Sequence, residues 1–285
     1  METRLEVAAL DSWQPLDRRT FLADMGKGAF ALAVVGLAAC GPSAIGSTLP
    51  SLSPAGSSGG RSGDQPSATP PGTSAAGGPP SGPPSSGGDD AVTWERVNLG
   101  FVSAYVLVRT GEAAIVDTGV SGSADEIEAA LGRVGLDWSA VGHLILTHHH
   151  NDHQGSAPDV LERAPDATGY AGGEDIPAIS VPRPLTAVAD GDAVFGLRIV
   201  TTPGHTAGSI SIHDPVGGVL VAGDALRTDG GKPTPPGGQF TVDMAQAKQS
   251  IVKIGELTFE TLLVGHGEPL VGGASAAVKA LGAAG

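Results

Sequence analysis

The hydrophobic pattern divides this 285-residue chain at about residue 91. Before that point, residues 41–90 contain almost no large apolar side chains, so no regular element is expected there. After it, short apolar runs alternate with turn residues, which is typical of β-strands. The pattern predicts strands at residues 102–108, 113–116, 143–147, 197–201, 209–213, 218–222 and 261–264.

Helical patterns interrupt these strands. Ile127, Leu131 and Val134 share one helical face, and the Ser-Ala-Asp-Glu segment that starts at Ser123 predicts a capping box before them. Further helices are predicted at residues 156–164, at residues 245–257 and in the Ala-rich segment that ends the chain. Groups of strands followed by helices favour layered α/β packing.

The N-terminal part carries an export pattern. Arg18 and Arg19 precede an apolar run at residues 29–39, which is shorter than the about 20 residues that a membrane-spanning helix needs. This pattern resembles a twin-arginine signal peptide. The run ends in Leu-Ala-Ala followed by Cys40, the chain's one cysteine, and resembles a bacterial lipobox. It implies cleavage before Cys40 and acylation of its sulfur, which would anchor the exported protein to the outside of the cytoplasmic membrane.

Residues 40–90 are rich in Ser, Gly and Pro. Such a segment buries too little surface to offset its ordering entropy, so it is expected to be a flexible tether. The predicted organisation is a signal peptide at residues 1–39, the lipidated cysteine and tether at residues 40–90, and a catalytic domain at residues 91–285.

The charge of the chain narrows its partners. The formal net charge is −14, and an acidic chain repels phosphate backbones, so nucleic acid is not expected to bind. The expected partners are a small-molecule substrate and, through Cys40, the membrane. The oligomeric state does not follow from the sequence.

A dense histidine segment carries the chemistry. His148 and His150 are two positions apart, so in an extended segment both imidazoles share one face, whereas His149 points away. Asp152 and His153 lie in the following turn and can reach a second point nearby. Imidazole and carboxylate groups suit zinc, iron or manganese. The alternatives are a solvated surface patch or a structural metal site.

The motif His148-x-His150-x-Asp152-His153 resembles that of the metallo-β-lactamase superfamily. Other segments resemble that family's remaining motifs, in its order. They are Thr-Pro-Gly-His-Thr around His205, Ala-Gly-Asp ending at Asp224, Gly-His-Gly around His266, and Ile-Val-Asp-Thr-Gly around Asp117.

This resemblance implies an αββα sandwich that holds two divalent metal ions between two β-sheets. His148, His150 and His205 would bind one ion, and Asp152, His153 and His266 would bind the other. Asp224 would bridge both, and Asp117 would support the site without touching metal. Zinc is the expected metal, and iron and manganese remain open.

The function implied is a dinuclear metal-dependent hydrolase. A hydroxide bridging two ions would attack a small ester, thioester or lactone, with Asp152 and Asp224 as catalytic ligands. An aspartate at position 224 resembles the glyoxalase II-like and lactonase-like branches. Three alternatives stay open: a β-lactamase, a mononuclear iron oxygenase that uses only the three histidines of the first site, and a metal-binding lipoprotein without enzymatic activity.

Substrate selection is expected in two Pro- and Gly-rich loops, residues 172–185 and 225–240. Their cations, Arg183, Arg227 and Lys232, could each bind an anionic substrate group or could simply be solvated. Tyr170 could donate a hydrogen bond to an oxyanion. The sequence does not decide these roles.

Overall fold

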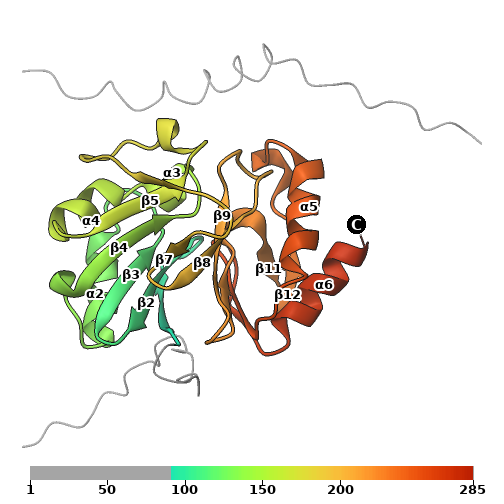
Figure 1. Cartoon of the computed structure of the whole chain (residues 1–285), viewed down its shortest axis with the longest axis horizontal. Coiled ribbons are helices and arrows are strands. Elements are labelled where there is room, and N and C mark those ends of the chain that lie inside the picture. Colours follow the sequence, from blue (N-terminus) through green and yellow to red (C-terminus); the bar gives the residue numbers. More distant parts are fainter. Residues whose placement is uncertain (1–90, 285) are drawn as a thin grey trace, which may run out of the picture. The chain divides into compact units, whose positions relative to one another are not determined.

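The computed structural model describes residues 91–284. The predicted signal peptide, the lipidated Cys40 and the tether lie outside these residues and stay predictions. Within the described part, two six-stranded sheets face each other and helices cover their outer faces (Figure 1). This arrangement is the predicted αββα sandwich.

The first sheet has the strand order β1-β2-β3-β4-β5-β6. The pairs β1–β2 and β2–β3 are antiparallel, and the pairs from β3 to β6 are parallel. Its strands are β1 (Thr93–Asn98), β2 (Ser103–Arg109), β3 (Glu112–Val116), β4 (Val141–Leu146), β5 (Thr168–Gly172) and β6 (Thr186–Val188).

The second sheet has the order β14-β13-β10-β9-β8-β7, and a separate hairpin joins β11 to β12. Only β10 and β13 pair in parallel. The strands are β7 (Ala193–Val194), β8 (Leu197–Thr201), β9 (Ile210–Asp214), β10 (Val219–Val221), β11 (Arg227–Asp229), β12 (Lys232–Thr234), β13 (Thr261–Leu263) and β14 (Leu270–Val271).

Helices α2 (Ala124–Arg133) and α4 (Ala157–Arg163) cover the first sheet, and α5 (Met244–Ile254) and α6 (Ala274–Ala284) cover the second (Figure 1). The short helix α3 (Asn151–Gln154) follows β4. Four 3₁₀ turns complete the described chain: η1 (Trp138–Ala140), η2 (Ile176–Ala178), η3 (Gly223–Ala225) and η4 (Gly238–Phe240). None of these helices has the length and hydrophobicity of a membrane-spanning segment.

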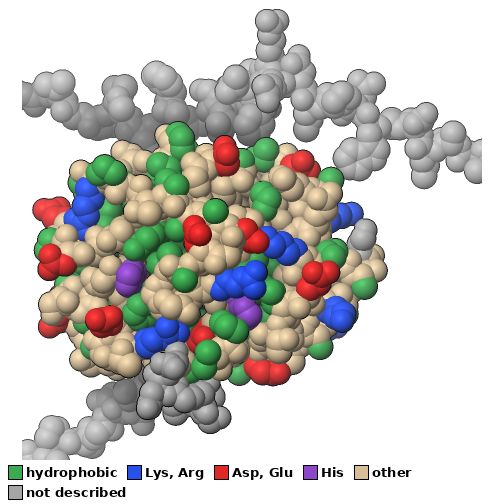
Figure 2. Space-filling model, viewed as in Figure 1, with side chains coloured by type: hydrophobic (Ala, Val, Ile, Leu, Met, Phe, Trp, Pro, Cys, Tyr) green, Lys and Arg blue, Asp and Glu red, His purple; other side chains and the backbone are tan. Residues whose placement is uncertain are grey.

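Three apolar layers hold the sandwich together. The central layer lies between the sheets and joins Tyr105 and Leu107 of β2 to Ile199 of β8 and Leu263 of β13. The outer layers join each sheet to its own pair of helices. The outer surface is polar, and Figure 2 shows acidic and basic side chains interspersed over one face rather than gathered by sign.

The predicted strands and helices are confirmed as elements, with bounds shifted by a few residues. The capping box at Ser123 was wrong. Ser123 occupies the N-cap position of α2, but its backbone angles of −86° and 9° are not extended and its side chain forms no capping hydrogen bond. Its backbone N–H instead donates to the Ser156 hydroxyl at 2.8 Å, which ties the start of α2 to the start of α4.

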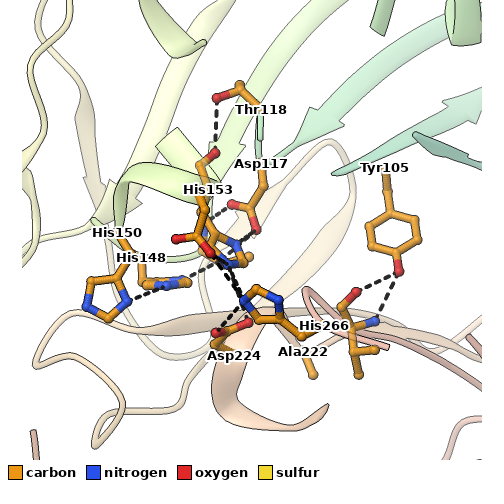
Figure 3. Close-up of polar contacts among 12 residues, drawn as sticks. Tyr105, Asp117, Thr118, His148, His150, His153, Ala222, Asp224 and His266 are labelled. Atoms are coloured by element: carbon orange, nitrogen blue, oxygen red, sulfur yellow. Dashed lines mark hydrogen bonds and ion pairs between the residues drawn. The ribbon is translucent and has the colours of Figure 1, made fainter. Parts of the chain in front are cut away.

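A buried tyrosine links the two sheets by polar contacts. The Tyr105 hydroxyl donates to the carbonyl of Val264 at 2.8 Å and accepts from its N–H at 3.2 Å (Figure 3). Tyr105 is 1% exposed, so water does not replace this partner. Val264 follows β13 directly, and the bond therefore fixes the strand end that leads to His266.

We expect Tyr105→Phe to lower the free energy of unfolding by about 1–3 kcal/mol, because both backbone groups of Val264 lose their partner in a buried place. Urea unfolding measures this loss. Tyr170→Phe is the control, since Tyr170 is only partly buried and packs against the His143 ring, and within residues 91–284 no hydrogen bond links its hydroxyl to a ligand-bearing strand. Equal losses in the two variants would contradict the assignment.

Candidate metal centre

Loops at one edge of the sandwich bring the seven predicted ligands together, and Figure 3 shows His148, His150, His153, Asp224 and His266 among them. Each ligand follows a strand or lies in the short helical turn after one, because strand ends at one edge let distant segments meet. The segments are the loop after β4 with helix α3, the loop between β8 and β9, the turn η3 after β10, and the loop after β13. They supply His148, His150, Asp152, His153, His205, Asp224 and His266.

Three histidines form the first group. His150 Nδ1 lies 3.2 Å from His148 Nε2 and 3.0 Å from His205 Nε2. The three nitrogens thus face one point, and each can offer a lone pair to the same ion. His149 does not join them, because its imidazole Nδ1 turns toward the carboxylate of Asp175 at 3.1 Å.

The second group lies against the first. His266 Nε2 is 3.3 Å from Asp152 Oδ2 and 3.5 Å from His153 Nε2. Asp224 stands between the groups: its Oδ2 is 3.4 Å from His205 Nε2 and 3.2 Å from His266 Nε2, and its Oδ1 is 3.4 Å from His153 Nε2. The carboxylate therefore lies within reach of both groups, as a bridging ligand requires.

Hydrogen bonds orient the imidazoles of the second group. His153 Nδ1–H donates to Asp117 Oδ2 at 2.8 Å, and His266 Nδ1–H donates to the Phe101 carbonyl at 2.7 Å. Both acceptors lack a proton, so the histidine nitrogen must carry it. In each ring Nε2 is left facing the centre, as a metal ligand needs.

The same logic assigns two histidines of the first group. The Thr147 hydroxyl donates to Asp117 Oδ2 at 2.8 Å, so at 3.0 Å it accepts from His148 Nδ1–H. The Thr241 hydroxyl donates to the Gly237 carbonyl, so at 3.2 Å it accepts from His205 Nδ1–H. The sequence patterns did not single out Thr241, because a threonine in a loop carries no signal of this role.

The two groups differ in charge. Burial lowers the pKa of His148 well below its usual range, and burial lowers the pKa of His205 to about 4. Hydrogen bonds to Asp152 and Asp224 raise the pKa of His266 to about 10. Burial alone would lower the pKa of His153, but the Asp117 and Asp224 carboxylates raise it on balance. The histidines of the first group are therefore uncharged at neutral pH. The carboxylates of the second group stabilise a positive charge, whether a proton or a metal cation carries it.

The residues present fit a pair of metal cations. Asp224 is 7% exposed, and its Oδ1 is a buried oxygen without a hydrogen-bond donor in the described part of the chain. An unpaired buried carboxylate oxygen is costly, and a cation between it and His153 would compensate it. The donor set of imidazoles and carboxylates suits zinc, iron or manganese.

Asp117 lies behind the ligand groups and contacts the segments that carry two of them. Its carboxylate is 2% exposed and accepts from the Thr147 N–H at 2.8 Å as well as from the Thr147 hydroxyl and His153. Its φ is 60°, an uncommon conformation for a residue other than glycine. This conformation turns the carboxylate toward two ligand-bearing segments at once.

Asp175 is a second support that the sequence did not reveal. It is 1% exposed and accepts from the His149 N–H at 3.0 Å, the Thr206 hydroxyl at 2.6 Å and the Gly208 N–H at 2.8 Å. His149 lies between two ligands, and Thr206 follows a third. One carboxylate thus ties the first histidine loop to the loop of His205. An aspartate in a Gly-rich loop gives no sequence signal for such a role.

A glycine permits the closest packing in the centre. A Cβ placed on Gly265 would overlap both Asp224 Oδ1 and His153 Cε1. Gly265 also donates its N–H to the Gly223 carbonyl at 3.1 Å, which joins the two ligand turns. The residue before His266 must therefore lack a side chain.

Of the four residues that the sequence suggested for substrate binding, one lines a cavity over the centre and three do not. A cavity of about 500 Å³ opens over the centre, and Arg227 lines it together with Phe101, Phe240, Asn151 and Gly237. Arg183 does not reach it, because its guanidinium donates to three carbonyls at the end of α4 and its loop. Lys232 and Tyr170 are not in the lining either, and Tyr170 packs against the His143 ring.

Comparison with known proteins agrees with this geometry. The profile of the metallo-beta-lactamase superfamily matches residues 97–266. A hydroxyacylglutathione hydrolase of Alkalilimnicola ehrlichii is 38% identical over 119 residues, which are 41% of this chain and 43% of that protein. The chain spans about half the length of the curated relatives it matches.

Solved structures show the same fold. A metallo-beta-lactamase family protein of Thermus thermophilus superposes with a TM-score of 0.55 at 22% identity, over 68% of this chain and 79% of that one. A second protein, TTHA1623, solved in a di-iron-bound form, gives a TM-score of 0.51 at 24% identity, over 61% and 92% of the two chains.

We expect Gly265→Ala to reduce bound metal to about one equivalent or less, because the added methyl displaces Asp224 and His153 together. Elemental analysis of the purified variant measures the loss. Gly132→Ala is the control, since a Cβ at that position of α2 meets nothing within 4 Å. Full metal content in Gly265→Ala would show that the added methyl group does not displace Asp224 and His153 enough to lose metal.

We expect Asp175→Asn to weaken metal binding by about 10–100-fold, because an amide cannot accept from all three donors. Competition with a chelator measures the affinity. Asp137→Asn is the control that separates an effect on ligand position from an effect on stability. Asp137 also accepts two hydrogen bonds, but it caps η1 and belongs to no ligand group. Unfolding should be affected in both variants and metal affinity only in Asp175→Asn; unchanged affinity there would refute the positioning role.

Proposed function

This chain belongs to the metallo-beta-lactamase superfamily, and we propose that it is a hydrolase that uses two divalent metal ions to cleave a small ester, thioester or lactone. His148, His150 and His205 would hold one ion. Asp152, His153 and His266 would hold the other, and Asp224 would be shared by both. The observation that carries this proposal is the buried Asp224 carboxylate, which lies within 3.4 Å of imidazole nitrogens of both groups.

The bound ions supply Lewis acidity and lower the pKa of a water toward neutrality. The chain's own residues prepare the site for that chemistry. The Nδ1 bonds described above keep four imidazoles in one tautomer, so each offers Nε2 without rearrangement. The buried walls exclude bulk water from His148 and His153, which are at most 1% exposed.

Asp152 has a further role on the pocket wall. Asp152 and Asp224 both line the cavity, but the Asp152 side chain is more exposed than that of Asp224. In the metal-free site a hydrogen bond from protonated His266 lowers the pKa of Asp152 to about 2, and a cation in the place of that proton would likewise keep the Asp152 carboxylate ionised. It can therefore orient an attacking water by accepting a hydrogen bond from it; one proton of that water passes to the leaving group, and the proton of the new carboxylic acid is released to solvent through the open cavity.

The substrate class follows from two considerations. The name of the hydroxyacylglutathione hydrolases describes cleavage of an acyl–glutathione bond, which is a thioester. A carboxylate at position 224, where the lactamase branch commonly carries cysteine or serine, favours esters, thioesters and lactones over β-lactams. Zinc is the proposed metal. Iron is the other candidate, since the di-iron protein shares the fold.

We expect Asp224→Ala to lower hydrolytic activity by orders of magnitude and to reduce metal content, because both groups lose the carboxylate they share. Elemental analysis and an assay on a thioester, a lactone and a chromogenic cephalosporin measure the two effects. Asp229→Ala is the control, because Asp229 is an exposed carboxylate of β11 that lies outside the ligand groups and the cavity lining.

Two results would contradict the proposal. Full activity with one equivalent of metal would refute the two-ion version. Turnover of none of the three compounds by metal-loaded protein, with freely exchangeable metal, would favour a metal-binding protein without enzymatic activity.

A further inference from the structure

One arginine at the edge of the first sheet is nearly excluded from water. Arg96 lies on β1, and its side chain is 7% exposed. A charge in such a place requires hydrogen-bond acceptors and an opposite charge around it. Its Nε donates to the Ser103 hydroxyl at 2.9 Å, its Nη2 to the Gly267 carbonyl at 2.9 Å, and its Nη1 to the Glu268 carboxylate. The guanidinium is thus bonded to two segments that are far apart in the sequence.

Both of these segments serve His266. The residues bonded to Nη1 and Nη2 follow it directly, so Arg96 contacts the backbone turn that carries this ligand. Ser103 follows the loop that contains Phe101, and the Phe101 carbonyl accepts from His266 Nδ1–H at 2.7 Å. One guanidinium therefore joins the turn that carries the His266 backbone to the loop that orients its ring.

The turn at residues 265–268 is held by other segments. Each of its four carbonyls accepts a hydrogen bond from outside the turn. The donors, in the order of the carbonyls, are the Ser103 N–H at 2.9 Å, the Thr228 N–H at 3.1 Å, Arg96 Nη2 at 2.9 Å and the Thr228 hydroxyl at 2.6 Å. Arg96 supplies the bond to the residue directly after His266, and it is the one side chain of the first sheet among these donors.

His266 depends on such support more than its neighbour does. Its side chain is 17% exposed, whereas the His153 side chain is fully buried. Packing therefore fixes His153 on all sides, but the position of His266 follows mainly from its backbone and its Nδ1 bond. Loss of a partner that orients a ligand typically weakens metal binding by about 10–100-fold.

We propose that Arg96 is a positioning residue, which holds His266 in place for the second ion. This inference rests on the proposed function, because it concerns the same centre. A guanidinium has no lone pair for a metal, and Arg96 does not line the cavity, so it acts through the turn. Its charge opposes a nearby cation, but the paired Glu268 carboxylate reduces that repulsion. The hydrogen bonds are therefore the larger effect.

The first test separates the two metal-binding steps. Metal-free protein is titrated with zinc in competition with a fluorescent chelator, and His266→Ala shows which step belongs to the second group. We expect Arg96→Gln to weaken that step by about 10–100-fold and to leave the other step unchanged. Arg96→Lys should weaken it as well, because an ammonium group keeps the charge but lacks the planar fork. This second variant decides the question if Arg96→Gln does not fold.

Arg109→Gln is the matched control. Arg109 is the last residue of β2 and Ser103 is the first, so the control lies at the opposite end of the strand. Its side chain is 17% exposed, donates to the Phe195 carbonyl at 2.8 Å and lies 4.0 Å from an Asp214 carboxylate oxygen. Urea unfolding should show a loss of stability in both glutamine variants, whereas only Arg96→Gln should lose zinc affinity.

A second measurement needs no metal. Hydrogen exchange of the metal-free protein, followed by mass spectrometry, reports on the Ser103 and Thr228 amides, whose acceptors lie in the turn at residues 265–268. Both amides should exchange faster in Arg96→Gln than in the wild type, because the turn has lost one of its bonds. Arg109→Gln should not change their exchange.

Three results would overturn the inference. Unchanged zinc affinity in Arg96→Gln, with or without faster exchange, would show that the turn does not set the ligand. Stronger binding in the second step would show that the charge of Arg96 outweighs its hydrogen bonds. An equal loss in Arg109→Gln would assign the effect to general stability. If the selective loss is observed but the wild type with two zinc ions cleaves no ester, thioester or lactone, the proposed hydrolysis is refuted and the positioning role is supported.

Discussion

The structure is organised around a buried carboxylate that lacks enough hydrogen-bond donors. Asp224 is almost excluded from water, and one of its oxygens has no donor within residues 91–284. A charge in such a place is tolerated only if opposite charge stands next to it. Five imidazoles and a second carboxylate surround Asp224, and these groups suit a cation better than a proton. The remainder of the site follows from the need to keep these groups at the right separation.

The fold meets that need by using both sheets at one edge. His148, His150 and His153 come from the end of the first sheet, whereas His205, Asp224 and His266 come from the second. A central apolar layer fixes the distance between the sheets, and the Tyr105 hydroxyl adds a directional bond to the strand that leads to His266. Buried carboxylates then tie the loops to each other. Asp117 joins the Thr147 segment to His153, and Asp175 joins the His149 segment to the loop of His205.

The scaffold separates the buried ligands from the exposed rim of the cavity. Four of the five histidine ligands are held by hydrogen bonds at Nδ1, so their rings have little freedom to adapt to a substrate. Phe101, Arg227 and Phe240 project from loops whose backbones are bonded to the ligand segments, while their side chains remain exposed. Exposed side chains on loops that a rigid scaffold positions are where binding residues usually lie.

The amino-acid sequence by itself determined the layered α/β class, most of the strands and helices, and the seven residues that converge. Local periodicity and a dense run of histidines are properties of short segments, so they can be recognised without coordinates. The sequence could not reveal Asp175 or Thr241 as supports, it led to a wrong capping box at Ser123, and it left Arg183, Arg227 and Lys232 equivalent. Those outcomes depend on which distant backbone groups lie near each side chain. Only tertiary packing decided that Arg183 binds carbonyls at the end of α4 while Arg227 faces the cavity, because a hydrogen bond requires a partner in space and not a neighbour in sequence.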